Sequence, residues 1–265
     1  MARNRIYNKN VFITGASRGI GAEIAKKCGE KGARLFLFAR NGGLLQQLKE
    51  KIEMEHGAEV FIYKLDVSKP DEIEKVFAKA LADGGGIDVL VNNAGFGVFR
   101  KAEEVNIEEA REMFLVNVVG LIACTTAVLP KFIEQRRGHI INIASQAGKI
   151  ATPKSSVYSS TKHAVLGYTN SLRMELSDYN IFVTAVNPGP IATDFFNTAD
   201  VSGTYVKNVE KFMLKPEAVA DEIVRKMLVP AREINLPRWM NAGSLIYSLF
   251  PRLFEKAGKK FLNRK

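Results

Sequence analysis

Cysteine is scarce in this sequence: Cys28 and Cys124 are the two cysteines among 265 residues, and no C-x-x-C motif occurs. They lie far apart within helix-like patterns, which favours two buried free thiols over a disulfide or a zinc site. The three histidines, His56, His139 and His163, share no metal-ligand spacing. We therefore expect no bound metal.

Long hydrophobic runs are also missing. No stretch approaches the roughly 20 consecutive apolar residues of a membrane-spanning helix. The first ten residues are polar and basic, without the apolar core or cleavage site of a signal peptide. The sequence indicates a cytoplasmic protein that is not integral to a membrane.

Acidic residues are too few to balance the basic ones, and the formal net charge is +10. Residues 231–265 contain eight Lys or Arg and two Glu, which leaves a net charge of +6 in this segment alone. No helix-turn-helix, RNA-recognition or zinc-finger signature accompanies the excess. Binding to nucleic acid is therefore not expected.

The same C-terminal segment is amphipathic. Apolar residues recur at helical spacing among its lysines and arginines, and Pro251 suits the start of a second helix. The apolar residues are Leu245, Ile246, Leu249, Phe250, Leu253 and Phe254. We divide the chain into a main domain, 1–238, and a basic helical extension, 239–265. The extension could cover a substrate pocket, form a dimer contact, or lie at a membrane surface as a peripheral anchor.

Short β-rich apolar runs alternate with longer segments of helical period along most of the chain. This alternation predicts a doubly wound α/β fold, with helices on both faces of a parallel sheet of about seven strands. The expected strands are 10–14, 33–39, 58–65, 87–92, 138–144, 181–187 and 233–236. Pro70 and Pro216 suit the first turns of two helices. The longest irregular stretch, 188–214, follows the sixth strand, at the sheet edge where ligands bind in such folds.

The first expected strand leads directly into a glycine-rich turn and then into a helical pattern. Glycine permits a tight turn and close backbone approach, and the free amides of a helix start attract a pyrophosphate. The sequence therefore predicts a dinucleotide site at this turn. Its expected binding residues are Gly15, Ser17, Arg18, Gly19, Ile20 and Gly21.

The end of the second expected strand indicates which dinucleotide binds. Folds that select NAD usually place an acidic side chain there to bind the ribose 2′-hydroxyl. Here Ala39 is followed by Arg40. Together with Arg18, Arg40 could bind a 2′-phosphate, and no carboxylate is present to repel it. We expect NADP(H); the alternative is that Arg40 is merely a solvated side chain.

Tyr158 and Lys162 have i, i+4 spacing in an apparent helix, so the phenol and the ammonium share one face. A free phenol has a pKa of about 10, and a nearby cation favours the phenolate, which would make Tyr158 a usable acid or base. Such a pair also occurs by chance on many helix surfaces. Ser145, thirteen residues before Tyr158, and Asn117, in an earlier helical segment, complete the set of candidate catalytic residues.

The G-x-x-x-G-x-G turn and these four residues resemble the short-chain dehydrogenase/reductase family over roughly residues 8–230. The resemblance implies a Rossmann-type fold and hydride transfer between NADP(H) and a carbonyl or alcohol carbon. It implies that Tyr158 exchanges the proton and that Ser145 holds the substrate oxygen. Lys162 would assist Tyr158 and contact the nicotinamide ribose, and Asn117 would support a water chain toward Lys162.

The resemblance also implies further cofactor contacts. Residues after the third strand would face the adenine, those after the fourth would let the backbone approach the cofactor, and those after the sixth would pack on the nicotinamide. The residues so implied are Asp66, Val67, Asn93, Ala94, Gly95, Pro188, Gly189, Ile191 and Thr193, in addition to Tyr158 and Lys162.

The substrate is expected to be a carbonyl or alcohol among small molecules, of apolar character: lipid-like, acyl or otherwise bulky. Apolar residues follow the fourth and sixth strands, where they would suit a hydrophobic pocket. They are Phe96, Gly97, Val98, Phe99, Phe195, Phe196, Phe212 and Met213. The habit of the family implies a homodimer or homotetramer built from the Asn117 and Tyr158 helices. A protein of another class, an NADPH-binding regulator or scaffold without turnover, is the main alternative.

Overall fold

The computed structural model describes residues 4–200 and 203–262, with residues 257–262 described by their backbone alone. Residues 201–202 of the expected 188–214 loop and residues 263–265 of the expected extension lie outside the described residues.

The described chain contains one seven-stranded parallel sheet, as predicted. Its strands are β1 (Asn10–Thr14), β2 (Arg34–Ala39), β3 (Val60–Lys64), β4 (Val89–Asn92), β5 (Gly138–Ile143), β6 (Ile181–Pro188) and β7 (Glu233–Leu236). Their order across the sheet is β3-β2-β1-β4-β5-β6-β7. In the register, Val11 of β1 pairs with Leu35 on one side and with Val89 on the other. The strand order reverses at this point, which is where doubly wound folds bind ligands.

Helices connect the strands. They are α1 (Gly19–Glu30), α2 (Gly42–His56), α3 (Pro70–Gly84), α4 (Ile107–Phe114), α5 (Leu121–Gln135), α6 (Ser156–Glu175), α7 (Phe195–Ala199), α8 (Thr204–Val209), α9 (Pro216–Lys226), α10 (Arg238–Leu249) and α11 (Pro251–Leu262). Short 3₁₀ helices span Ala102–Glu104, Gln146–Gly148, Ser177–Tyr179 and Glu210–Phe212. As predicted, α3 and α9 begin at Pro70 and Pro216, where the missing N–H costs nothing.

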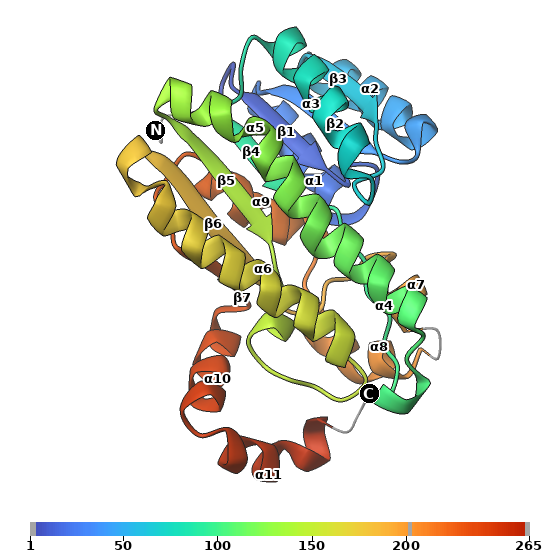
Figure 1. The fold of residues 1–265 in the computed structure, drawn as a ribbon. Coiled ribbons are helices and arrows are strands. Elements are labelled where there is room, and N and C mark those ends of the chain that lie inside the picture. Colours follow the sequence, from blue (N-terminus) through green and yellow to red (C-terminus); the bar gives the residue numbers. More distant parts are fainter. Residues whose placement is uncertain (1–3, 201–202, 263–265) are drawn as a thin grey trace.

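The five inner strands are buried on both faces, which explains why their sequences are largely continuous apolar runs instead of alternating ones, whereas the edge strands β3 and β7 are only partly buried. Helices α1, α2 and α9 cover one face, and α3, α5 and α6 cover the other (Figure 1). Phe12, Phe36 and Phe38 point to the second face, where Phe12 stacks on Phe36 at 4.5 Å between ring centroids. Cys28 and Cys124 are both buried and free, as expected.

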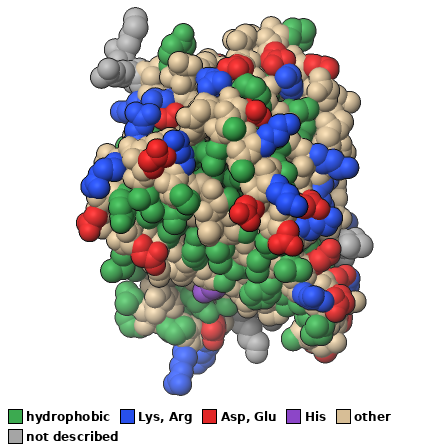
Figure 2. Space-filling view, turned by 45° about the horizontal axis from the view of Figure 1, so that its top comes forward, with side chains coloured by type: hydrophobic (Ala, Val, Ile, Leu, Met, Phe, Trp, Pro, Cys, Tyr) green, Lys and Arg blue, Asp and Glu red, His purple; other side chains and the backbone are tan. Residues whose placement is uncertain are grey.

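The helical segment Ile107–Gln135 is long and apolar enough to cross a membrane by length and composition, although the sequence had suggested no such segment. It comprises α4, a π-helical turn at Leu115–Gly120 and α5. Val128 and Phe132 of α5 are fully buried in the core, whereas Phe114 and Val119 are each 39% exposed. In the view of Figure 2, apolar side chains gather in the lower half of the molecule. The segment is thus a core helix that leaves part of its apolar surface uncovered.

The stretch expected to be irregular is more ordered than predicted. Within 188–214, the short helices α7 and α8 form, and Ile191 bridges to Leu214. Aromatic contacts explain the order: Phe196 lies 5.3 Å from Phe195 and 5.5 Å from Tyr205 between ring centroids. The stretch nevertheless begins where expected, at the carboxyl end of β6.

Candidate active site

The glycine-rich turn between β1 and α1 has a backbone that requires glycine. Gly15 adopts φ +65°, and a Cβ atom there would lie 2.8 Å from the Cα atom of Ala94. A Cβ atom on Gly21 would lie 2.4 Å from the carbonyl oxygen of Gly15. Gly19 and Ile20, at the start of α1, line a cavity of about 790 Å³, and no side-chain cap satisfies the amides of this first turn. The turn therefore fits a pyrophosphate.

Two arginines lie at the neighbouring end of this cavity. Arg18 precedes α1 and Arg40 follows β2; both are exposed, and both line the cavity. No carboxylate stands at this strand end, because Ala39, Arg40 and Asn41 follow one another there. Asn41 instead caps α2 by accepting a hydrogen bond from the amide of Leu44 at 3.0 Å. The site carries positive charge where an NAD-selective fold would carry a carboxylate.

Side-chain amides hold the ends of β1 and β4 together beneath the cavity. The Nδ2 atom of Asn93 donates to the carbonyl oxygens of Thr14 at 3.0 Å and Gly15 at 3.1 Å. The amides of Asn93 and Ala94 donate in turn to the Thr14 hydroxyl, at 3.0 and 3.1 Å. These bonds bring the backbone of Ala94 and Gly95 to the cavity wall.

Asp66 and Val67 line the cavity beyond the end of β3. The Oδ1 atom of Asp66 accepts from the amide of Ser68 at 3.0 Å and from its hydroxyl at 2.8 Å. Asp66 therefore shapes the turn before α3, and this local role accounts for an aspartate at the position without any ligand. A contact between Asp66 and the adenine of a cofactor stays a prediction.

Asn117 lies within the π-helical turn between α4 and α5 and is 1% exposed. Its Nδ2 atom donates to the carbonyl of Phe96 at 2.8 Å and to the hydroxyl of Thr161 at 3.1 Å, and its Oδ1 atom accepts from the amide of Phe96 at 3.0 Å. π-Helical turns are rare and occur mainly at functional sites. Here the turn points an amide between the loop after β4 and helix α6.

Ser145, Tyr158 and Lys162 meet on the cavity wall. Tyr158 and Ser145 share a hydrogen bond, and the Ser145 hydroxyl also accepts from the amide of Ala147 at 3.0 Å. The Nζ atom of Lys162 donates to the carbonyl of Ile143 at 2.8 Å and lies 5.8 Å from the centre of the Tyr158 ring. The structure thus brings the residues together as the i, i+4 spacing predicted, but Lys162 is anchored to β5 and not to the phenol.

Burial controls the protonation of this pair. It raises the pKa of Tyr158 to about 12, and the hydrogen bond with Ser145 offsets only part of that rise. Burial also lowers the pKa of Lys162 to about 8. The sequence-based expectation was that Lys162 would favour the phenolate; in the chain alone, desolvation outweighs that effect. The Tyr158 phenol is therefore protonated at neutral pH.

The segment after β6 forms the opposite wall. Pro188, Gly189, Ile191 and Thr193 all line the cavity. Gly189 donates to the carbonyl of Leu236 at 2.6 Å, and a Cβ atom on it would lie 2.8 Å from the sulfur of Met240. Close packing against α10 therefore explains a glycine at this position.

All the predicted site residues line one cavity except Gly21 and Asn117, which lie directly behind its wall. Of the residues expected to shape the substrate pocket, Gly97, Val98 and Met213 are not among those that line it. The others expected for the substrate line the same cavity as the glycine turn: Phe96, Phe99, Phe195, Phe196 and Phe212.

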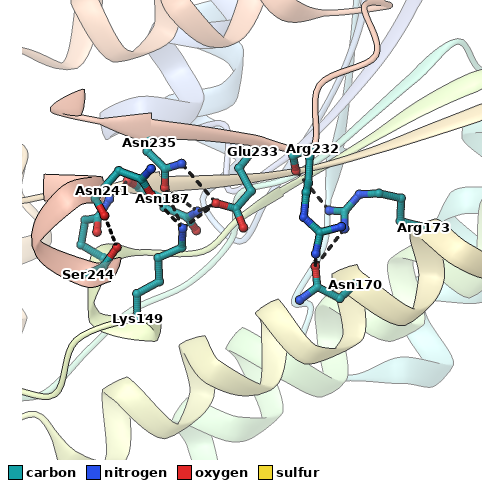
Figure 3. Close-up of polar contacts among 10 residues, drawn as sticks. Lys149, Asn170, Arg173, Asn187, Arg232, Glu233, Asn235, Asn241 and Ser244 are labelled. Carbon is teal, nitrogen blue, oxygen red and sulfur yellow. Dashed lines mark hydrogen bonds and ion pairs between the residues drawn. The ribbon is translucent and has the colours of Figure 1, made fainter. Parts of the chain in front are cut away.

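Sequence reasoning missed a polar cluster that fixes α10 beside the cavity (Figure 3). The Nζ atom of Lys149 contacts Glu233 at 2.5 Å, Asn235 at 3.0 Å and Asn241 at 3.4 Å. Burial alone would raise the pKa of Glu233, but hydrogen bonds from Lys149 and Asn235 bring it below its ordinary value. These residues are distant in sequence and follow no motif, so no sequence pattern could have predicted the cluster.

Helix α10 and the start of α11 also contribute to the cavity wall. The residues they supply are Trp239, Met240, Gly243 and Phe254. Tyr205 of α8 was missed as well; it lies 5.3 Å from Phe99 between ring centroids. The amphipathic pattern of the C-terminal segment indicated pocket cover as one of three alternatives, but it could not identify the side chains involved.

Comparison with known proteins gives relatives that match most of the chain. An uncharacterized oxidoreductase of Staphylococcus saprophyticus is 39% identical over 226 residues, which cover 83% of this chain and 90% of that protein. An NADP-dependent 3-hydroxy acid dehydrogenase of Schizosaccharomyces pombe is 34% identical over 259 residues, 92% of this chain and 98% of that protein.

A solved structure shares the fold. The alcohol dehydrogenase from the archaeon Thermococcus sibiricus, complexed with 5-hydroxy-NADP, is 32% identical and has a TM-score of 0.78 over 86% of this chain and 95% of that one. Residues 9–201 match the family described as short chain dehydrogenase. The chain belongs to the short-chain dehydrogenase/reductase family of oxidoreductases.

Proposed function

We propose that this protein is an NADPH-dependent reductase of apolar carbonyl compounds in which Tyr158 is the general acid. The observation that supports it best is a neutral phenol, hydrogen-bonded to Ser145, in the wall of the cavity that also contains the glycine turn. A buried phenol with a pKa of about 12 retains its proton until a substrate oxygen gains negative charge. The NADP-dependent relative from Schizosaccharomyces pombe and the archaeal structure complexed with 5-hydroxy-NADP support this proposal.

The dinucleotide would lie across the carboxyl ends of β1 and β4. Its pyrophosphate fits the first turn of α1, and Arg18 and Arg40 would bind a 2′-phosphate. When bound, NADPH supplies the hydride that reaches the carbonyl carbon. Ser145 holds the carbonyl oxygen, and Tyr158 donates its proton to that oxygen. Lys162 holds positive charge beside the phenol, while Asn117 fixes the loop after β4 against α6.

The aromatic wall supports an apolar substrate. Phe99 lies 6.0 Å from Tyr158 and 6.5 Å from Phe195 between ring centroids. Phe195 lies 5.6 Å from Tyr158. Rings packed this close to the phenol leave an apolar surface next to the reacting oxygen, and such pockets bind hydrophobic ligands. Bulky aliphatic, acyl or aromatic carbonyls are the proposed substrate class.

We also propose a homodimer or homotetramer in the cytoplasm. Exposed apolar residues on the α4–α5 segment support self-association, because large apolar side chains on a helix that is otherwise part of the core tend to be covered. Residues 1–238 would form the catalytic domain, with α10 and α11 as an extension that contributes to its pocket.

The test is the loss of NADPH absorbance over a panel of aliphatic, acyl, steroid and aromatic carbonyls. The Tyr158→Phe variant should bind NADPH normally and lose turnover by about 10²- to 10⁴-fold, as expected for a missing general acid. Tyr179→Phe, a tyrosine outside the cavity, is the matched control and should retain full activity. Retained turnover in Tyr158→Phe would refute its role. NADPH binding without turnover of any carbonyl would favour a regulator or scaffold.

A further inference from the structure

The C-terminal arm, which comprises α10 and α11, carries an unusual concentration of exposed apolar side chains. Thirteen large hydrophobic residues of the described chain are exposed, and six of them fall within residues 239–253. They are Trp239 at 62%, Leu245 at 61%, Ile246 at 52%, Leu249 at 63%, Phe250 at 59% and Leu253 at 67% exposed. Single exposed hydrophobic residues are ordinary, but a contiguous group marks an interaction surface.

The arm presents two different faces. Trp239, Met240 and Gly243, spaced i, i+1 and i+4, line the cavity. Leu245 and Leu249 lie on another face of the same helix and are turned to solvent. One helix of the arm therefore carries both a part of the cavity wall and an exposed apolar surface.

The two helices of the arm are held as one unit that projects from the body of the molecule (Figure 1). Tyr247 of α10 lies 5.3 Å from Phe254 of α11 between ring centroids, with the rings edge to face. Lys149 anchors the first turn of α10 through Asn241. The exposed face is thus preformed, and its residues need not fold to bind a partner.

Charge distinguishes between the possible partners. Residues 231–265 have a net charge of +6, and the whole chain has +10. Pairing the arm with a second copy would bring like charges together, whereas an anionic surface would be attracted. Arg238, Arg252 and Lys256 are exposed on the arm beside the apolar face. Apolar residues flanked by basic ones are typical of helices that lie in the interface of a bilayer.

We infer that the C-terminal arm is a docking surface for an anionic lipid bilayer and that apolar substrates pass from the bilayer into the cavity along it. Leu245, Ile246, Leu249, Phe250 and Leu253 enter the headgroup region, and the basic side chains contact lipid phosphates. The docking step stands independently of catalysis. Substrate entry rests on the proposed carbonyl reductase activity.

The sole tryptophan of the chain provides a direct measurement, because Trp239 lies on the arm. The full chain is mixed with vesicles of phosphatidylcholine alone or with added phosphatidylserine. We expect pelleting with the anionic vesicles, a shift of tryptophan emission to shorter wavelength, and quenching by brominated lipid. An unbound protein with unchanged emission in both vesicle types would overturn the inference.

Two double variants isolate the apolar face. Leu245→Asp with Leu249→Asp should weaken vesicle binding by at least about tenfold, because each buried leucine contributes about that factor. Met54→Asp with Met174→Asp is the matched control: these residues are 81% and 78% exposed, lie elsewhere, and change the net charge equally. Equal binding by both double variants, abolished by salt, would show adsorption by charge alone and overturn insertion.

The same proteins test whether a second copy of the chain, and not a bilayer, covers the exposed face of the arm. Sedimentation velocity of the wild-type chain and of Leu245→Asp with Leu249→Asp should give the same mass. A smaller mass for that variant, with no vesicle binding by the wild type, would assign the face to self-association and overturn the inference.

Substrate entry is measured with one short water-soluble carbonyl and one long-chain carbonyl held in vesicles. Leu245→Asp with Leu249→Asp should retain kcat/KM for the soluble compound and lose at least about tenfold for the vesicle-held one. Equal loss on both compounds would overturn entry along the arm. Absence of turnover in the wild type would refute the proposed activity, while the vesicle-binding result would stand.

Discussion

Under the proposed function, replacing Arg40 by aspartate should shift the cofactor preference from NADPH toward NADH. The change removes a cation from the end of β2 and places a carboxylate there, which is the arrangement that binds a ribose 2′-hydroxyl. Arg40 lines the cavity, and its side chain is exposed, so the substitution perturbs no packed core.

The magnitude follows from the type of contact. A charge-assisted hydrogen bond contributes about 1.5–3 kcal/mol, which corresponds to a change of about ten- to a hundredfold in affinity. Arg40 is exposed to water, so we expect the lower part of this range from losing the guanidinium. Repulsion between the new carboxylate and a 2′-phosphate adds to it. The expected result is at least about tenfold weaker NADPH binding with unchanged or improved NADH binding.

The assay measures Kd for both cofactors by fluorescence titration and kcat/KM for both in the same buffer. Arg18→Ala, and the double variant Arg18→Ala with Arg40→Asp, report whether the two arginines bind one phosphate. If they do, the losses in binding free energy from the two substitutions will not add up in the double variant. Arg5→Asp, an exposed arginine away from the cavity, controls for the change in net charge. An unchanged ratio of NADPH to NADH affinity in Arg40→Asp would refute the assignment of the 2′-phosphate site.

Three other perturbations have expected outcomes. Gly21→Ala should abolish NADPH binding in a titration, because its Cβ atom would lie 2.4 Å from the Gly15 carbonyl oxygen; full affinity would show that the turn can shift. Burial lowers the pKa of His139 from its ordinary value of 6.5 to about 3. As the pH falls below 6.5, the unfolded chain therefore takes up a proton on this histidine before the folded chain does, and the folded state loses stability. Denaturant titrations should show wild type losing about 3 kcal/mol more than His139→Gln between pH 6.5 and pH 4; parallel losses would contradict this. Lys149→Met leaves Glu233 without its ion-pair partner and should lower the free energy of unfolding by about 1–3 kcal/mol. It should also speed proteolysis within α10. An unchanged rate of cleavage would show that Lys149 does not anchor the helix.

The covered parallel sheet and the dinucleotide turn could be predicted because each depends on local constraints. Continuous apolar strands between amphipathic helices have few packing solutions other than a covered parallel sheet. A turn in which a Cβ atom on Gly15 would lie 2.8 Å from the Cα atom of Ala94 excludes every side chain there, so its glycines are visible in the sequence. Local requirements of this kind restrict which residue types can occur at neighbouring positions, so they leave a pattern that can be read from the sequence.

Contacts between distant segments left no such pattern. Lys149, Glu233 and Asn241 come together only because β7 lies beside β6 and directs α10 back over the 3₁₀ turn after β5. The helices α7 and α8 form for a similar reason, since aromatic side chains from 195–205 pack on Phe99. Their order depends on tertiary contacts, and propensity alone could not indicate it.

The spacing of Tyr158 and Lys162 predicted where these side chains lie but not their protonation. The i, i+4 spacing correctly placed Tyr158 and Lys162 on one face, but charge proximity is only one of the influences on a pKa, and burial moves both groups toward neutrality. At neutral pH the phenol holds its proton, which is the state that reduction requires. Oxidation would need the phenolate, so under the proposed mechanism alcohol oxidation should gain more than carbonyl reduction as the pH rises. Under the proposed mechanism, the depth at which α6 places the phenol therefore sets the pH range in which the phenol can donate a proton.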